Sequence, residues 1–210
     1  MNTKSYRKHD IPNDYIDKWQ KTVDFMAKIY EVPAGLIMRV WPEKIEVLVS
    51  SYSEGNPYRP GENEKLMGKL YCETVMETGA ELNVPNALED KHWKDNPDVK
   101  LNMIMYLGIP LIWSNDEIFG TICVLDKKTR IFSQVYHDLL WELKKIIEND
   151  FKLITVNHEL KSFNNKLVDR EMRIIEMKEE VNRLSEELGR EPTYPPIWCD
   201  VTKPKKNGEN

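Results

Sequence analysis

Cysteine, long apolar runs and basic blocks are all scarce in this 210-residue sequence. Its three cysteines, Cys72, Cys123 and Cys199, are widely spaced and none belongs to a C-x-x-C pair, so neither a disulfide framework nor a zinc ribbon is indicated. No run approaches the roughly 18 apolar residues of a membrane span. The net charge is −5 and the one lysine cluster lies at residues 203–206, which argues against nucleic acid as a primary partner. We therefore expect a cytoplasmic protein that binds neither membrane nor nucleic acid.

The apolar pattern predicts an α+β fold. Between residues 14 and 30, apolar side chains recur every three or four positions, as on an amphipathic helix. AGLIMRVW and KIEVLVSSY predict two strands joined by a turn at residues 42–44, and MIMYLGIPLIW and EIFGTICVLD predict two more. Between these pairs, a short helix is expected after Gly68, ended by Gly79, followed by a brief strand in ELNVPNA. We expect a central antiparallel β-sheet with helices on one face.

The stretch after Ser133 contains neither proline nor glycine before Gly189, so it predicts one long helix. Its second half carries two apolar rows of heptad spacing, interrupted once at Arg170. An isolated helix cannot bury so narrow a seam, so we expect a parallel homodimeric coiled coil. The predicted seam residues are Leu153, Leu160, Leu167, Ile174, Val181 and Leu188, with Val156, Phe163, Met177 and Leu184 in the second row.

Several segments in a fixed order, YCETV, VPNA, NPD, YLGIPL and FGTICVLD, resemble a GAF domain of the bacterial and archaeal sensory type. The resemblance covers about residues 15–154. It implies a sheet with the first and last helices on one face and a small-molecule pocket under loops on the other. It also implies signalling to a kinase, cyclase or other regulator. We expect an N-terminal arm (1–13), a GAF domain (14–152), a coiled-coil signalling helix (153–189) and a disordered proline-rich tail (190–210).

The resemblance leaves the ligand and any cofactor unknown, because the signature residues of bilin-binding and cyclic-nucleotide-binding members are missing. The segment after Gly189 is too short for a kinase, cyclase or helix-turn-helix domain, so we expect a separate output partner. The sequence thus predicts a non-enzymatic small-molecule sensor that relays ligand state through a dimeric coiled coil. Two alternatives stay open. One is a thiol-based redox enzyme or sensor that uses Cys72, similar to the reductases of free methionine sulfoxide, and the other is a dimerisation adaptor whose pocket is filled by its own side chains.

The candidate site residues include a thiol and a guanidinium. Cys72 is followed by Glu73, and the nearest basic residue is Lys69; an acidic neighbour tends to raise a thiol pKa, so we interpret Cys72 as pocket wall rather than nucleophile. Arg39 interrupts an apolar strand, so its guanidinium must reach solvent, an internal carboxylate or an anionic ligand. Aromatic and soft apolar side chains complete the set. The predicted ligand-binding residues are Arg39, Trp41, Tyr71, Cys72, Trp93, Met103 and Tyr106.

Overall fold

The structure, a computed structural model, describes residues 11–195. By its internal contacts the chain divides into two units, Met1–Thr155 and Val156–Asn210. The predicted N-terminal arm and C-terminal tail reach into residues 1–10 and 196–210, which lie outside the described residues. Across the described part of the chain, no helix combines the length and the apolar character that crossing a membrane requires.

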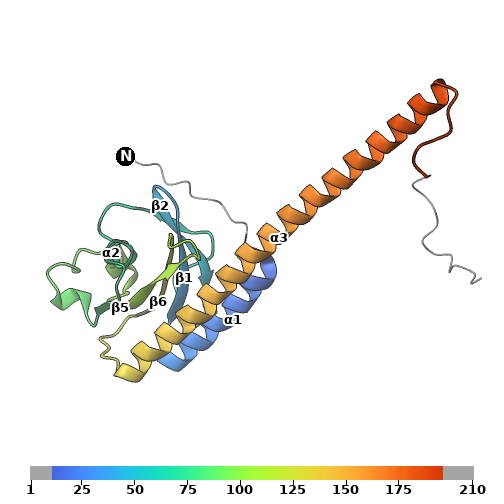
Figure 1. Cartoon of the computed structure of the whole chain (residues 1–210). Coiled ribbons are helices and arrows are strands. Elements are labelled where there is room, and N and C mark those ends of the chain that lie inside the picture. The colour runs from blue at the N-terminus through green and yellow to red at the C-terminus, as the bar shows by residue number, and fades with distance from the viewer. Residues whose placement is uncertain (1–10, 196–210) are drawn as a thin grey trace, which may run out of the picture. The chain divides into compact units, whose positions relative to one another are not determined.

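The first unit is built on a six-stranded sheet in the order β3-β2-β1-β6-β5-β4, and every neighbouring pair is antiparallel (Figure 1). This confirms the predicted α+β class and antiparallel sheet. One edge strand of three residues was not among the predicted strands. All three residues are polar and exposed, so they show no apolar pattern. The strands are β1 (Ala34–Val40), β2 (Lys44–Ser50), β3 (Asn63–Lys65), β4 (Leu82–Val84), β5 (Met105–Ile112) and β6 (Ile118–Asp126).

Two helices cover one face of this sheet. They are α1 (Asn13–Tyr30) and the first part of α3 (Gln134–Glu187), and both contribute to a single apolar core with the sheet (Figure 1). Trp19 of α1 is fully buried against Phe151 of α3, with ring centroids 5.5 Å apart. Its indole N–H donates to the buried carboxylate of Asp150 at 2.9 Å. The apolar stripe predicted for the first helix therefore packs as expected, and the indole N–H of Trp19 has a hydrogen-bond acceptor.

The opposite face is covered by α2 (Tyr71–Thr78), two 3-10 helices and loops, over a second apolar core. The start of α2 is fixed by Glu73, whose carboxylate accepts the backbone N–H groups of Gly68, Lys69 and Leu70 at 2.7–2.8 Å. A negative charge in the first turn also suits the helix dipole. Gly79 ends the helix in the left-handed conformation, with φ 65°, as predicted from the sequence. The 3-10 helices are η1 (Ala87–Glu89) and η2 (Pro97–Leu101).

The second unit contains the rest of α3, which continues to Glu187 and confirms the predicted long C-terminal helix. The predicted seam is largely exposed in the single chain: Leu160 is 54% exposed, Phe163 58% and Leu184 45%. After Gly189 the backbone turns back, and the side chain of Asn182 exchanges two hydrogen bonds of 2.8 Å with the backbone of Tyr194. An apolar row on a helix surface therefore lacks a covering element among residues 11–195.

Candidate functional site

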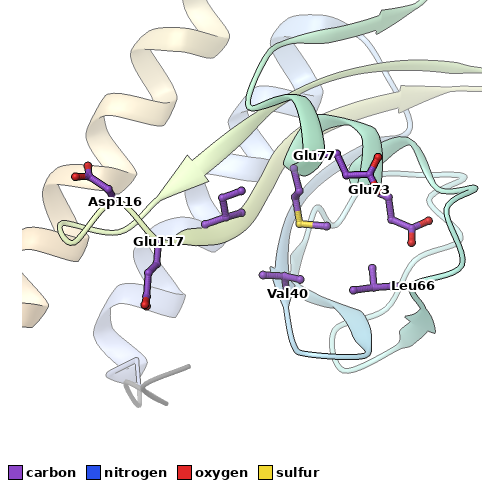
Figure 2. A pocket seen from close by; sticks show the side chains of 8 residues that line it. Val40, Leu66, Glu73, Glu77, Asp116 and Glu117 are labelled. Atoms are coloured by element: carbon purple, nitrogen blue, oxygen red, sulfur yellow. The ribbon is translucent and has the colours of Figure 1, made fainter. Parts of the chain in front are cut away.

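Two cavities lie beside α2, on the sheet face that the loops cover. The smaller has a volume of about 390 Å³ and is shown in Figure 2. Glu73 and Glu77 reach it from α2, Asp116 and Glu117 come from the turn between β5 and β6, and Val40 lies between them (Figure 2). Leu66, Met76 and Ile118 complete its lining. The Glu73 carboxylate is already occupied by the three backbone amides at the start of α2, so it acts here as a structural group.

The larger cavity, the Cys72 cavity, has a volume of about 540 Å³. Its floor consists of buried apolar side chains from β1, β2 and the residue before α2, and its mouth carries polar side chains from the β2–β3 segment and η2. The lining residues are Met38, Ile45, Val47, Tyr58, Glu62, Asn63, Glu64, Leu70, Cys72, Pro97, Asp98, Lys100 and Leu101. An apolar floor with a few convergent polar groups is the usual composition of a small-molecule site.

The polar end of the Cys72 cavity is formed by Tyr58 and Asp98. The Tyr58 hydroxyl donates to Asp98 Oδ1 at 2.7 Å. Burial raises the pKa of Asp98, and the hydrogen bond from Tyr58 offsets this only in part. Burial, followed by the charge of Asp98, raises the pKa of Tyr58 far above its usual value. The pair thus joins a neutral phenol to a carboxyl group that is poorly hydrated.

Cys72 lies on the wall of this cavity and contacts polar groups of the sheet. Thr121 Oγ1 donates to Cys72 Sγ at 3.3 Å, and Tyr106 Oη lies 3.4 Å from the same sulfur. A hydrogen bond from Cys123 is the main cause that lowers the pKa of Cys72, while burial raises the pKa of Cys123. This direction is opposite to the one expected from the acidic neighbour. That neighbour, Glu73, turns back to the amides before α2.

Behind Cys72, aromatic rings form a packed layer. Tyr71 stacks on Tyr106 with centroids 4.7 Å apart, and Trp93 lies 5.0 Å from Tyr71 on its other side. The Tyr71 hydroxyl is buried without a hydrogen-bond partner among the described residues. Gly108 leaves room for the Tyr106 ring, because a Cβ at this position would lie 2.5 Å from Tyr106 Cζ and 2.8 Å from the Cβ of Cys123. This close packing fixes the position of Cys72 on the wall of the cavity.

Arg39 and Trp41 lie elsewhere. Arg39 shares a strand face with Ile37, which belongs to the core under α1 and α3, whereas Met38 belongs to the core under α2. The Arg39 guanidinium lies 3.2 Å from Glu46 Oε2 and stacks over the Trp41 ring at 4.5 Å. The indole of Trp41 donates to the same carboxylate at 2.6 Å. The sequence allowed either an internal carboxylate or a ligand anion as the partner of Arg39. In the structure the partner is an internal carboxylate, that of Glu46.

The structure gathers five of the seven predicted site residues in or against the apolar core under α2, and it separates two from them. Of the five, Cys72 lines the cavity, whereas Tyr71, Met103 and Tyr106 are buried behind it and Trp93 packs at the edge. Sequence reasoning missed Tyr58, Asp98 and Thr121. The NPD segment that contains Asp98 carries the family resemblance, but its sequence alone does not place the carboxyl group in the cavity. The gathered residues are Tyr71, Cys72, Trp93, Met103 and Tyr106.

Comparison with known proteins identifies the fold of the first unit. A sequence model of the GAF domain matches residues 14–140. The blue-light absorbing form of the Thermosynechococcus elongatus PixJ GAF domain matches with a TM-score of 0.60 at 14% identity, over 73% of this chain and 94% of that chain. The GAF domain from Acinetobacter phosphoenolpyruvate-protein phosphotransferase matches with a TM-score of 0.54 at 17% identity, over 70% and 85% of the two chains.

A third similar structure is an enzyme. The free methionine-R-sulfoxide reductase from Neisseria meningitidis, in complex with its substrate, matches with a TM-score of 0.57 at 14% identity, over 70% of this chain and 83% of that chain. A search of curated proteins gives no significant match. At these low identities the structural likeness concerns the fold, which photoreceptors and enzymes share.

Proposed function

Because the chain belongs to the GAF domain family, we propose that it is a sensory module that binds a small molecule in the Cys72 cavity. The cavity itself is the observation that supports this proposal most. Its volume of about 540 Å³ lies within the range of about 300–1,000 Å³ that is usual for ligand sites. An apolar floor and the polar pair Tyr58 and Asp98 would bury and orient a small molecule.

A chain of contacts supports a relay from this cavity to α3. Cys72 lies in the first turn of α2, and Glu81 follows the end of that helix. The Glu81 carboxylate lies 2.6 Å from His137 Nδ1 and accepts the indole N–H of Trp141 at 2.9 Å, so it joins the segment after α2 to the first turns of α3. We propose that a ligand which favours one position of α2 biases α3 through this bridge. Such a bias requires that the ligand bind the two positions of α2 with unequal affinity.

We further propose that the exposed apolar row after Val156 binds a second copy of the chain as a parallel coiled coil. The heptad spacing and the exposure of this row support the proposal. In this arrangement the paired helices would pass ligand state to a separate kinase, cyclase or other regulator, because a coiled coil can shift between discrete registers.

Light scattering tests the dimer. At about 50 μM we expect a dimer for the full chain and a substantially weaker one for the chain ended after Thr155. Leu167→Asp, on the seam, should also give monomers, whereas Asn165→Asp, on the outer side of the same turn, should not. A full chain that remains monomeric at this concentration would falsify the coiled-coil proposal.

Native mass spectrometry of protein purified without added ligand tests the sensor. A bound small molecule should accompany the wild type and be lost from Val47→Phe, which fills the Cys72 cavity. Val135→Phe is the matched control, since Val135 is an exposed residue of α3. If the wild type carries no small molecule and Val47→Phe is more stable than wild type, the pocket is merely an underpacked core, and the dimerisation adaptor is the better reading.

Thiol redox chemistry is a second candidate, favoured by the lowered pKa of Cys72, of which Cys123 is the largest cause. The sulfoxide oxygen of free methionine sulfoxide would pass to Cys72 Sγ, giving methionine and a sulfenic acid. Cys123 Sγ would then attack the sulfenic sulfur, forming a disulfide and releasing water. A dithiol reductant of the cytoplasm, which we propose as the location, would then reduce this disulfide by thiol–disulfide exchange, becoming a disulfide itself and restoring both thiols.

An activity assay separates the two candidates. Wild type, Cys72→Ser and Cys123→Ser are incubated with free methionine-R-sulfoxide and dithiothreitol, and methionine is measured. Turnover by the wild type that Cys72→Ser abolishes, with the fold retained, would establish the enzyme. The sensor proposal expects no methionine from any of the three proteins.

A further inference from the structure

Acidic residues outnumber basic ones in the lining of the Cys72 cavity. Glu62 directly precedes β3, Glu64 belongs to β3 and Asp98 belongs to η2, whereas Lys100 is the single basic residue of the lining. Arg39, the cation that the sequence suggested for this role, is paired with an internal carboxylate on the other face of the sheet. The cavity therefore attracts positive charge and disfavours anions.

Asp98 is half-buried, whereas Glu62 and Glu64 are exposed. The Asp98 side chain accepts one hydrogen bond, from Tyr58 Oη at 2.7 Å, and no ion pair among residues 11–195 includes it. A carboxylate removed from water without a counter-ion loses hydration that a single phenol does not replace. The same group would gain most from a cation placed beside it.

The backbone holds Asp98 in place for such a contact. Its N–H donates to Asn96 Oδ1 at 2.8 Å, and its carbonyl accepts the N–H of Met103 at 3.0 Å. Asn96 in turn donates to the carbonyl of Lys69 at 2.8 Å, which ties η2 to the start of α2. A carboxyl group fixed in this way would bind a ligand without a large ordering cost. Through Asn96, Asp98 would also connect the ligand to α2, the helix that carries Cys72.

The rest of the cavity determines the chemical character of the other end of the ligand. Met38, Ile45, Val47 and Leu70 form a continuous buried apolar floor. From this floor and the carboxyl group above it, we propose that the ligand is a small apolar molecule with a protonated amine, and that the amine binds Asp98. The inference rests on the proposed sensory function and adds the charge class of the ligand to it.

Three probes of similar shape test this inference: 2-phenylethylamine, 2-phenylethanol and phenylacetate, titrated calorimetrically into the full chain. We expect the amine to bind, the alcohol to bind about 10- to 100-fold more weakly, and the carboxylate not to bind, because a hydrogen bond to a charged partner is the stronger kind. Asp98→Asn should remove the preference for the amine. Asp95→Asn is the matched control, since Asp95 is exposed in the turn before η2 and the change in net charge is equal.

Several outcomes would overturn the inference. They are phenylacetate binding at least as tightly as the amine, no probe binding to the wild type, and an unchanged preference for the amine in Asp98→Asn. The comparison of the three probes on the wild type needs no variant, so it decides the matter even if Asp98→Asn fails to fold. The proposed function is judged separately by the native mass spectrum. An anionic molecule found in that spectrum would support the sensory function and contradict the proposal that the ligand is an amine.

Discussion

Asp98→Asn is expected to make the ligand-free protein more stable at neutral pH. Asparagine keeps an oxygen that can accept the hydrogen bond from Tyr58, which spans 2.7 Å in the wild type, but it removes the poorly hydrated charge. Weakening a charged hydrogen bond to a neutral one loses about 1 kcal/mol. Burial raises the pKa of Asp98 in spite of this hydrogen bond, so we expect the lost hydration to be the larger effect. We expect a net gain on the order of 1 kcal/mol in the free energy of unfolding.

The gain depends on pH. The pKa of Asp98 in the folded state lies above its value of about 4 in the unfolded chain, so the folded state holds the proton more tightly. The free energy of unfolding of the wild type therefore falls as pH rises through the interval between these two pKa values. The Asp98→Asn variant lacks this fall. Its advantage over the wild type is full above the folded-state pKa and disappears below the unfolded-state pKa.

Urea unfolding followed by tryptophan fluorescence, at about pH 7.5 and again near pH 3, measures both effects. Asp95→Asn serves as the control and should change the free energy of unfolding little at either pH. A loss of stability in Asp98→Asn at neutral pH would refute the reasoning. It would mean that the charged hydrogen bond to Tyr58 stabilises the fold and that Asp98 has a structural role.

Gly108→Ala should lower the free energy of unfolding by about 1–3 kcal/mol, because the new Cβ would come within 2.5 Å of Tyr106 Cζ; an unchanged melting temperature would contradict this packing. Asp150→Ala should lower the free energy of unfolding in urea by about 1–3 kcal/mol, because the buried indole N–H of Trp19 loses its acceptor. Asp150→Asn should lower it less, and equal losses would argue against that hydrogen bond. Glu73→Ala should lower the free energy of unfolding by about 1–2 kcal/mol and speed hydrogen exchange in α2, because three backbone N–H groups lose their acceptor. Unaltered exchange in α2 would exclude a capping role for Glu73.

Most of the fold could be predicted because its elements follow local rules. The stripe of α1 places Trp19, Met26 and Tyr30 on one side of a helix, and all three are buried. Gly79 ends α2 in the conformation that glycine adopts most readily. By contrast, the edge strand Asn63–Lys65 has no apolar alternation, since neither of its faces is buried. Only its pairing with β2 makes it a strand, and this depends on tertiary structure.

The hairpin register is sufficient to predict the partner of Arg39. With the predicted turn at residues 42–44, pairing outward from Trp41 and Lys44 places Arg39 opposite Glu46, as the structure has it. Opposite charges directly across an antiparallel pair attract each other. The internal partner of Arg39 was thus available from the hairpin alone. The contact between Tyr58 and Asp98 was not, because it joins two irregular segments 40 residues apart that have no periodic pattern.

The chemistry of Cys72 shows why neighbours in sequence are a poor guide to the pKa of a helical residue. Successive side chains on a helix point about 100° apart, so Glu73 and Cys72 face different surroundings. Glu73 turns toward the amides before α2, while Cys72 faces Thr121 and Cys123 of β6 and Tyr106 of β5. Hydrogen bonds from these distant strands favour the thiolate more than burial opposes it. The direction of the shift is therefore set by how α2 packs on the sheet, and substitutions at Thr121 should change the reactivity of Cys72 more than substitutions at Glu73 that keep α2 intact.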